Sequence, residues 1–248
     1  MPAFAPPALA APPPGLPNAL ELAKPHMQRI GPGLWVAPLA KGVWVTSFTH
    51  RLDKDTMYPA NGLVVDAADG AMLVDPGWEP AQAKALLAWA QRTLTHPVRR
   101  AIITHSHEDR SAGIAVLAEA GIPSYGLART RELLLQKRRA PVEALPDLET
   151  KPWRGAGGLE VRFPGPGHAP DNLVVWVPSA KVLYGGCLLK STTAPGLGNL
   201  EDADLDQWPR TMHRVREAYP DVRIQVPGHG TVEGDAIAHT LELLAAPR

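Results

Sequence analysis

A short stretch of the chain holds three side chains that commonly bind metals. His105, His107 and Asp109 follow one another at intervals of two residues, directly after the apolar, β-branched run 102–104. Imidazole and carboxylate are among the ligand types that zinc accepts from proteins. At the end of a strand, residues two apart point the same way, so His105 and His107 can share one metal ion. Asp109 lies where we expect the chain to turn into a helix, and it could serve a neighbouring metal. The alternative is a polar loop in which two histidines happen to be close.

Three more ligand-type residues each follow a glycine just after a predicted strand. They are His168 after strand 158–163, Cys187 after strand 182–184, and His229 after strand 222–226. Glycine lets the backbone turn tightly, and strand-end loops are where rigid scaffolds usually present chemistry. A lone cysteine is more often a buried, inert side chain, and a lone histidine is more often structural or on the surface. The shared pattern weakens both alternatives and predicts that the three residues meet in one cleft.

Alternating strands and helices must position these residues. Further strands are predicted at 33–37, closed by Pro38, and at 42–48, 61–66, 71–75, 98–104, 122–125 and 173–177. Helices are predicted at 79–94, 110–120, 128–139, 204–219 and 232–245. Between them lie a polar hairpin loop at 49–59 and a proline-punctuated connection at 141–152. Strand and helix alternation, together with paired strands that have no helix between them, indicates an α/β protein with mixed sheets.

Composition limits the classes of partner. The 25 Lys and Arg residues balance the 25 Asp and Glu residues, which gives no support to a nucleic acid or an anionic membrane as partner. A single cysteine excludes an intrachain disulfide. Residues 1–23 are rich in proline and alanine and predict a flexible, extended arm. Residues 24–248 then form one domain, because no internal linker is visible.

At this point the motifs resemble those of a known family, the metallo-β-lactamases. The resemblance covers roughly residues 42–239. Its motifs are Thr104-His105-Ser106-His107-Glu108-Asp109-Arg110, Gly167-His168-Ala169-Pro170-Asp171-Asn172, Gly185-Gly186-Cys187-Leu188-Leu189-Lys190, Leu197-Gly198-Asn199-Leu200 and Pro227-Gly228-His229-Gly230. The His-x-His-x-Asp element alone marks only the wider superfamily. Its combination with Gly-Gly-Cys-x-x-Lys and Gly-Asn-Leu is similar to the first subclass of the class B enzymes.

One residue separates this chain from the other relatives. Glyoxalase II, the tRNA-processing nucleases and the third lactamase subclass carry a histidine directly after the aspartate. Here that position is Arg110, which cannot bind a metal because it stays protonated. Cys187 supplies the compensating ligand. The second lactamase subclass usually has asparagine in place of the first histidine, whereas His105 is present here.

The resemblance implies a four-layer αββα sandwich, in which two mixed sheets are flanked by helices, and two Zn²⁺ ions per chain. By the resemblance, one zinc is bound by His105, His107 and His168, and the other by Asp109, Cys187 and His229. Three protein ligands per ion leave an open position, which is typical of a catalytic site.

The implied reaction is hydrolysis of the β-lactam amide bond in penicillins, cephalosporins and carbapenems, which confers resistance to these antibiotics. Zinc-bound hydroxide, oriented by Asp109, would attack the lactam carbonyl without an acyl-enzyme. The first zinc would polarise that carbonyl with help from Asn199, and the second would stabilise the leaving nitrogen. Asn199 could equally be a turn residue.

Two basic residues complete the implied site. Lys190 would bind the substrate carboxylate beside the lactam nitrogen, its alternative being a solvated surface lysine. Arg110 would hold Asp109 or the Cys187 thiolate by charge.

Several residues near the site have less defined roles. Loop 49–59 matches the family's mobile flap, although it is more charged than usual, and Trp78 either lines the cleft or packs. Five histidines match no ligand position and are expected on the surface: His26, His50, His96, His213 and His239.

The remaining expectations follow from the resemblance as well. We expect a monomer that acts on a small-molecule β-lactam in the periplasm, with no nucleic-acid or membrane partner. Two alternatives remain: another hydrolase of the same superfamily, such as a thioesterase or lactonase, or a zinc-binding protein without catalysis. Fold similarity alone does not separate them, because one fold hosts many activities.

Overall fold

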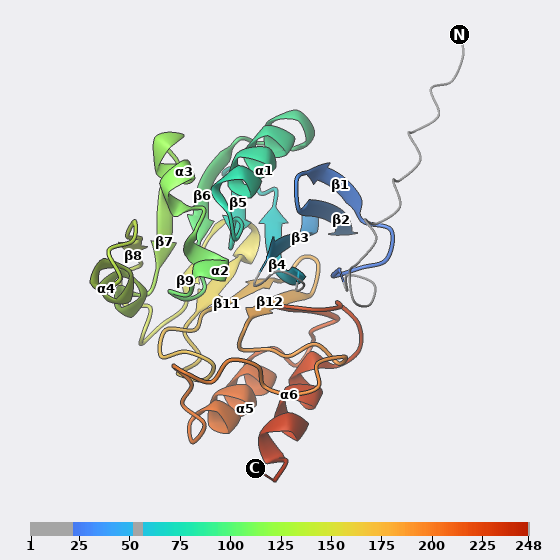
Figure 1. Cartoon of the computed structure of the whole chain (residues 1–248), viewed down its shortest axis with the longest axis vertical. Helices are drawn as coiled ribbons and strands as arrows, with labels where there is room; N and C mark the ends of the chain where they lie inside the picture. The colour runs from blue at the N-terminus through green and yellow to red at the C-terminus, as the bar shows by residue number, and fades with distance from the viewer. Residues whose placement is uncertain (1–21, 52–56, 248) are drawn as a thin grey trace.

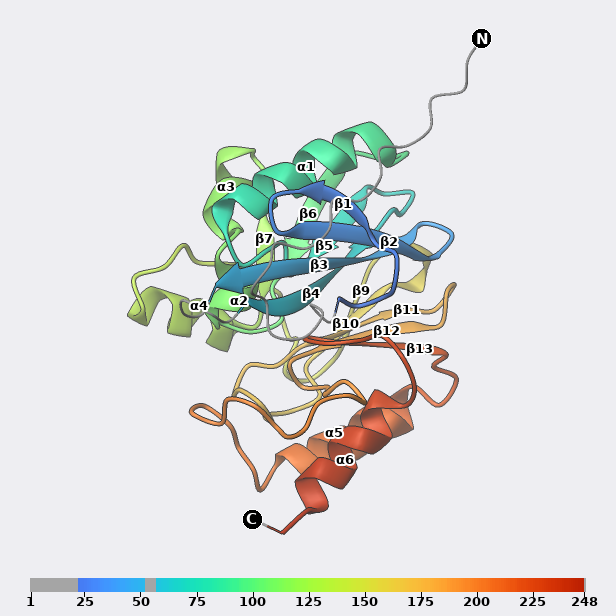
Figure 2. The same ribbon diagram turned by 45° about the vertical axis from the view of Figure 1, so that its right-hand side comes forward.

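The computed structural model describes residues 22–51 and 57–247 of the chain. Two sheets lie face to face, and helices cover the outer face of each, as Figures 1 and 2 show. The predicted four-layer α/β sandwich is therefore confirmed.

The first sheet is built from the N-terminal part of the chain, residues 28–144, with its strands side by side in sequence order. The strands are β1 (Gln28–Gly31), β2 (Leu34–Ala40), β3 (Val43–Arg51), β4 (Met57–Val65), β5 (Ala71–Val74), β6 (Val98–Ile102), β7 (Ser124–Gly126) and β8 (Glu143–Ala144). The helices of this part are α1 (Pro80–Thr93), α2 (Glu108–Ser111), α3 (Ile114–Glu119) and α4 (Ala128–Gln136). Pairing is antiparallel from β1 to β5 and parallel from β5 to β8, so the sheet is mixed.

The second sheet comes from the C-terminal half and is also mixed. Its strands are β9 (Trp153–Arg154), β10 (Glu160–Arg162), β11 (Val174–Val177), β12 (Val182–Gly186) and β13 (Ile224–Pro227), with a 3₁₀ turn at Ala156–Gly158. Its helices are α5 (Trp208–Ala218) and α6 (Ala236–Ala245). Only β12 and β13 pair in parallel, and this pair delivers two candidate ligands to the same edge of the sheet.

Three apolar layers hold the sandwich together. Met72 and Val74 of β5 point into the core between the sheets, where they meet residues such as Val175 of β11. Leu73, between them, points outward and packs under α1 and α3. Both faces of β5 are covered, so all four of its residues are buried, and a strand buried on both faces needs apolar side chains throughout. A third cluster lies under α5 and α6.

The start of α1 is fixed against the base of the β3–β4 hairpin. The Gln82 side chain accepts hydrogen bonds from the backbone N–H groups of Trp78 and Glu79, at 2.9 and 3.0 Å. Its own amide donates to the Thr49 carbonyl at 2.7 Å. These bonds satisfy donors at the helix N-terminus and hold Trp78 beside the hairpin.

Two predicted boundaries were wrong for a physical reason. Pro38 does not close its strand, because β2 continues to Ala40. The neighbouring strand β1 pairs no further along β2 than Val36, so the missing N–H of Pro38 falls where β2 has an open edge.

The flap was predicted as loop from residue 49 to 59, yet β3 and β4 pair up to Arg51 and Met57. Polar side chains do not prevent a two-stranded ribbon, and residues 52–56 lie outside the described part.

Other elements differ in extent. Helix 110–120 is divided into α2 and α3 around Gly113, and the helices predicted from 204 and 232 begin at Trp208 and Ala236. The short strands β1, β8 and β9 were not predicted. The N-terminal arm lies outside the described residues except for Leu22 and Ala23. Ala23 is fully buried, and its N–H donates to Ser47 Oγ at 3.0 Å.

Within the ranges that the structure describes, no helix has the length and apolar character that crossing a membrane requires.

Candidate metal centre

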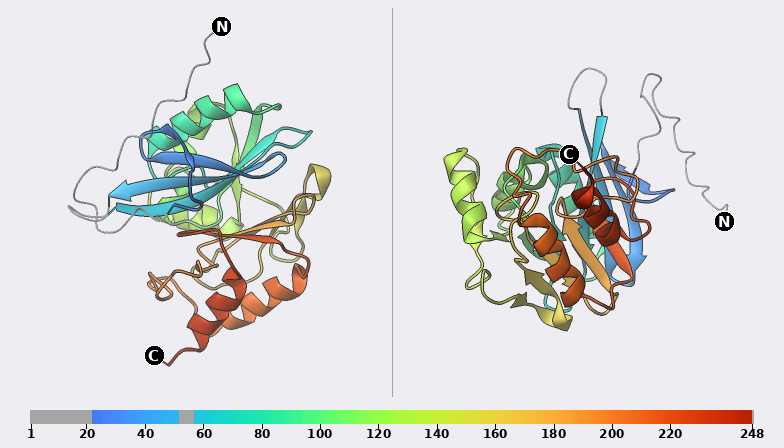
Figure 3. Two further views of the ribbon diagram at one scale, coloured as in Figure 1. Left: turned by 90° about the vertical axis from the view of Figure 1, so that its right-hand side faces the viewer. Right: turned by 90° about the horizontal axis from the view of Figure 1, so that it is seen from below.

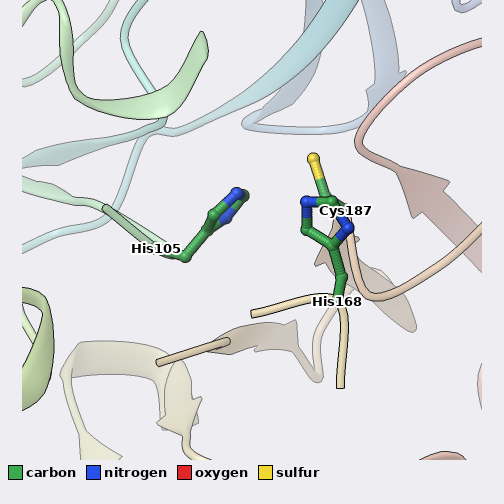
Figure 4. Close-up of side chains that lie close together, drawn as sticks. All are labelled: His105, His168 and Cys187. Carbon is green, nitrogen blue, oxygen red and sulfur yellow. The ribbon is translucent and has the colours of Figure 1, made fainter. Parts of the chain in front are cut away.

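The six predicted ligands meet at one end of the seam between the two sheets. The first half of the chain contributes His105 and His107 just after β6, and Asp109 in α2. The second half contributes His168 after β10, Cys187 after β12 and His229 after β13. Figure 3 shows the two halves as separate layers, and Figure 4 shows His105, His168 and Cys187 converging from three segments.

Three imidazole rings face one another across a small space. Ring centroids lie 4.6 Å apart for His105 and His107, and 5.2 Å from His168 to each of the other two. His105 is fully buried, yet neither of its ring nitrogens has a hydrogen-bond partner among the described residues, and the same holds for Nδ1 of His168. Burial lowers the pKa of both histidines well below 6.5. The rings are therefore neutral, with free lone pairs, which is the state that binds a metal.

The other three ligands are in contact with one another. Cys187 Sγ lies 3.5 Å from Asp109 Oδ2 and 3.2 Å from His229 Nε2, and His229 Nε2 lies 3.2 Å from Asp109 Oδ2. His229 Nδ1 lies 2.7 Å from the Pro59 carbonyl, which orients the ring with Nε2 toward the cluster. Burial raises the pKa of the Cys187 thiol to about 12, although Arg110 opposes this.

Arg110 is fully buried behind this second group. Its guanidinium donates to Asp109 Oδ2 at 2.9 Å and to the backbone carbonyls of Asn61 and Gly228 at 2.6 and 2.8 Å. Burial alone would raise the pKa of Asp109, but Arg110 and His229 outweigh it and hold the pKa well below 3.8. Arg110 thus keeps Asp109 ionised and also ties the two sheets together.

The loop that carries His229 lies directly against the loop that carries Cys187. A Cβ at Gly228 would come within 2.6 Å of the Cys187 nitrogen and 2.8 Å of its sulfur. No other residue fits there without moving the backbone. The glycine before His229 therefore allows a close approach.

The donor set fits zinc. Three overlapping groups have all their ligand atoms within 4.8 Å of one another: His105, His168 and Cys187; His105, His107 and Asp109; and Asp109, Cys187 and His229. The last is the predicted second zinc site, and the first two together contain the whole predicted first site. Neutral imidazole, carboxylate and sulfur are ligands that zinc takes, and the unpartnered nitrogens of His105 and His168 are donors with nothing else to bind.

Comparison with known proteins identifies the family. Residues 55–229 match the sequence pattern of the Metallo-beta-lactamase superfamily. The Metallo-beta-lactamase type 2 of Bacillus sp. (strain 170) is 38% identical over 213 residues, which cover 84% of this chain and 81% of the relative. The chain belongs to the metallo-β-lactamases. It is therefore a zinc hydrolase by family.

Solved structures agree with this assignment. The metallo-beta-lactamase from Pontibacter korlensis superposes with a TM-score of 0.79 at 34% identity, over 85% of this chain and 98% of that one. FIM-1 from Pseudomonas aeruginosa, solved in its mono-zinc form, superposes with a TM-score of 0.81 at 29% identity, over 87% and 96% of the two chains.

The metal centre of this metallo-β-lactamase opens into a cleft of about 650 Å³. One wall comes from the β3–β4 hairpin and the start of α1, with His50, Tyr58 and Trp78. Trp78 stacks on His50 at 4.8 Å and lies edge-on to His229 at 6.1 Å. Of its two predicted roles, Trp78 therefore lines the cleft. The opposite wall contains Lys190, Asn199, Glu201, Asp202, Glu108, Lys137 and Arg139.

Lys190 is a buried cation in this cleft. Only 8% of its surface is exposed, and within the described ranges its ammonium has no ion pair. The ammonium lies 5.2 Å from the centroid of the Trp208 ring. The alternative of a solvated surface lysine is therefore wrong.

Asn199 was predicted either to face the substrate or to be a turn residue, and its position is compatible with both. It lines the cleft, and its Oδ1 accepts a hydrogen bond from the Glu201 backbone at 3.0 Å, as in an Asx turn. This bond leaves the side-chain amide N–H groups available to a ligand.

The five histidines outside the ligand set differ in exposure. His26 and His213 are exposed, as predicted. His50, His96 and His239 are half-buried and bonded to Glu79, Asp66 and the Ala194 carbonyl. His50 also lines the cleft, so its placement as a plain surface residue was wrong.

Sequence reasoning missed several residues around the site. Asp202 Oδ2 lies 2.8 Å from His107 Nε2, and Asp171 Oδ2 accepts from the Ser106 backbone at 2.9 Å. Tyr58 lies against His229, and Trp208 contacts both Lys190 and His168. Asp171 stands within the motif 167–172 but was given no role there, and Asp202 stands three residues beyond Asn199, so proximity to a motif was its only available signal.

Proposed function

We propose that this metallo-β-lactamase hydrolyses the amide bond of β-lactams with two zinc ions, without a covalent acyl-enzyme. One observation carries the proposal. The two predicted ligand sets adjoin each other at the floor of a cleft whose wall holds the buried ammonium of Lys190, which has no counter-ion among the residues that the structure describes. A β-lactam has the matching pair of features, an amide bond and a carboxylate close beside it.

Zinc would be held by His105, His107 and His168 on one side, and by Asp109, Cys187 and His229 on the other. When bound, zinc supplies Lewis-acid polarisation of the amide and lowers the pKa of water toward neutrality.

Asp109 is suited to orient the attacking water and to accept its proton. The contacts with Arg110, His229 and Cys187 all reach Oδ2, and no hydrogen bond to Oδ1 is found among the described residues. The free oxygen can therefore accept from water while Arg110 keeps the carboxylate fixed and ionised.

Lys190 would bind the substrate carboxylate, since a buried cation without a partner gains strongly from an anion. Asn199 would donate from its side-chain amide to the lactam carbonyl. Together they orient the ring so that the amide bond lies over the ligand cluster.

The experiment is a hydrolysis panel of a penicillin, a cephalosporin and a carbapenem, each with and without a chelator, followed by re-addition of zinc. We expect turnover that the chelator abolishes and zinc restores. A thioester and a lactone form the comparison panel. Turnover of those substrates with none of the lactams would assign the chain to the alternative superfamily hydrolases, and zinc binding with no turnover would assign it to non-catalytic binding.

Two further parts of the proposal have their own measurements. Metal analysis of the dialysed protein should give two zinc ions per chain. Fractionation of cells that carry the natural gene should place the protein in the periplasm, and sedimentation should give the mass of a monomer.

A further inference from the structure

We propose that Trp208 is a positioning residue, which holds the Lys190 ammonium at a set distance from the His168 loop. This inference rests on the proposed function in one respect, that Lys190 receives the substrate carboxylate. Trp208 is the first residue of α5 and is fully buried. Its indole touches both segments that must keep their spacing.

The first contact is with the lysine. Its Nζ lies 5.2 Å from the Trp208 ring centroid, within the range of a cation–π interaction. A lysine side chain has four flexible carbons, so burial alone does not choose one position for the ammonium. Within the described ranges no carboxylate pairs with it, and the indole face therefore supplies the specific attraction.

The second contact is with the loop that carries a metal ligand. The Trp208 and His168 ring centroids lie 5.9 Å apart at an angle of 63°. Gly167, just before His168, lies close to the indole. A Cβ at Gly167 would come within 3.0 Å of Trp208 Cδ1 and 2.5 Å of a Leu188 methyl.

A hydrogen bond fixes the indole between the two segments. Trp208 Nε1–H donates to the Leu188 carbonyl at 3.1 Å, in the turn that joins Cys187 to Lys190. The ring therefore cannot rotate without losing a buried hydrogen bond. One rigid side chain is thus in contact with the His168 loop, the Cys187–Lys190 turn and the ammonium.

These contacts predict a specific failure when the indole is removed. The ammonium would no longer be held where the carboxylate must bind, so binding of carboxylate-bearing ligands should weaken. A cation–π contact of about 1–2 kcal/mol corresponds to a roughly 5- to 30-fold change in binding. Turnover of a substrate that lacks the carboxylate should change much less.

The test is a double-mutant cycle on the full-length, zinc-loaded protein. KM and kcat are measured for benzylpenicillin and for its methyl ester in Trp208→Leu, Lys190→Ala and the double variant. The dissociation constant of hydrolysed benzylpenicillin, which keeps the carboxylate, is measured by calorimetry. We expect Trp208→Leu to raise KM and the dissociation constant for the acids about 5- to 30-fold, and to have no further effect once Lys190 is alanine.

Trp176→Leu is the matched control. Trp176 packs against the same hydrophobic cluster under α5 and α6, but its ring contacts Tyr219 rather than the cleft. It should lose packing in the same cluster and leave KM for both substrates unchanged. If Trp208→Leu does not fold, the double-mutant cycle is measured with Trp208→Phe in its place. Its smaller ring still faces Lys190, so we expect a rise in KM of roughly 2- to 5-fold that again depends on the lysine.

The outcomes separate this inference from the proposed function. Additive effects of Trp208→Leu and Lys190→Ala, or equal effects on the acid and its ester, would overturn the positioning role while the enzyme remains a lactamase. Wild-type protein that binds the hydrolysed acid but cleaves no lactam would overturn the proposed function, and the calorimetric cycle would still decide the role of Trp208. Wild-type protein that neither binds nor cleaves would overturn both.

Discussion

The two halves of the metal centre have opposite internal chemistry. In the group formed by His105, His107 and His168, both ring nitrogens of His105 and Nδ1 of His168 are buried and have no partner among the described residues. In the group formed by Asp109, Cys187 and His229, the ligand atoms already contact one another, and Arg110 holds the carboxylate. The first group thus contains two neutral imidazoles, those of His105 and His168, with unpartnered nitrogens. The second is a closed network that contains a protonated thiol.

The difference indicates the order of metal binding. A zinc at the three-histidine group releases no proton from His105 or His168, because burial already keeps these two rings neutral. A zinc at the second group must release the thiol proton of Cys187, whose pKa is raised to about 12, and must separate existing contacts. We therefore infer that the three-histidine group binds zinc more tightly at neutral pH.

Removing one ligand from each group gives the largest expected effect. His168→Ala should lose the tighter zinc and lower turnover by roughly 10³-fold, since Lewis-acid stabilisation is worth several kcal/mol. Cys187→Ser should keep one zinc and lower turnover by roughly 10- to 100-fold. Metal analysis after dialysis and initial rates provide the measurements. Equal zinc loss in both variants would contradict the expected difference in affinity between the two groups. Unchanged zinc content and rate in Cys187→Ser would refute the two-zinc assignment.

Removal of the Arg110 guanidinium, which lies behind the second group, should have the next largest effect. Arg110→Ala leaves the buried Asp109 carboxylate without its guanidinium partner, so the zinc-free protein should lose about 3–5 kcal/mol of unfolding free energy in urea. Zinc affinity should fall at the second site only. Arg129→Ala is the matched control, because its pair with Glu132 is exposed and should contribute at most about 0.5 kcal/mol. Equal losses in the two variants would contradict the role of Arg110.

A third difference should be visible in the pH dependence of stability without zinc. His105 and His168 have lowered pKa values in the folded state and titrate near 6.5 when unfolded. Just below pH 6.5 the unfolded chain binds more protons. The free energy of unfolding should therefore fall with falling pH, by up to about 1.4 kcal/mol per pH unit for each histidine. Asp109, with its pKa held well below 3.8, contributes only in more acidic solution.

Variants separate the groups that titrate in this range. The pKa of His229 is also lowered, so His229 adds to this fall. The pKa of Asp75 is raised to about 6, so below that pH Asp75 makes the free energy of unfolding rise as the pH falls. The informative quantity is thus the change in slope on mutation. His105→Asn should flatten the slope between pH 7 and 5 more than His229→Asn does. A larger change for His229→Asn would reverse the comparison.

The smallest expected effect concerns the outer side of the three-histidine group. Asp202 accepts from His107 Nε2 and so leaves Nδ1 as the free donor atom. Asp202→Ala should lower the affinity for the first zinc by about 10-fold, measured by chelator competition. Glu201→Ala, next to it in the same cleft wall, is the control and should have little effect. An affinity that does not change in Asp202→Ala would show that the ring is oriented without its help.

The meeting of the six candidate ligands could be predicted from sequence, because each stands in a short motif at or just beyond the end of a strand. The residues that surround it could not. In the sequence, Trp208 is one apolar residue in a helical pattern. Its hydrogen bond to the Leu188 carbonyl exists only because α5 packs against the Cys187–Lys190 turn in the folded chain. Asp202 becomes a partner of His107 only because residues 95 positions apart meet in the fold.

Errors in the predicted elements have a similar origin. Local composition suggested that Pro38 would end a strand and that residues 49–59 would form a loop. Both inferences treated the strand in isolation. What decides the outcome is the neighbour, since β1 stops short of Pro38 and β4 accompanies β3 to Arg51.

The strand order has a consequence for how the centre forms. In both sheets every strand pairs only with its neighbours in sequence, so each sheet can assemble from local segments at a small entropic expense. Contacts across the seam join more distant segments, such as Arg110 and Gly228, which are 118 residues apart, and each predicted zinc site takes ligands from both sides of the seam. The metal centre is thus expected to be the last part of the molecule to form. A folding intermediate with two complete but undocked sheets would have the secondary structure of the enzyme and no affinity for the metal.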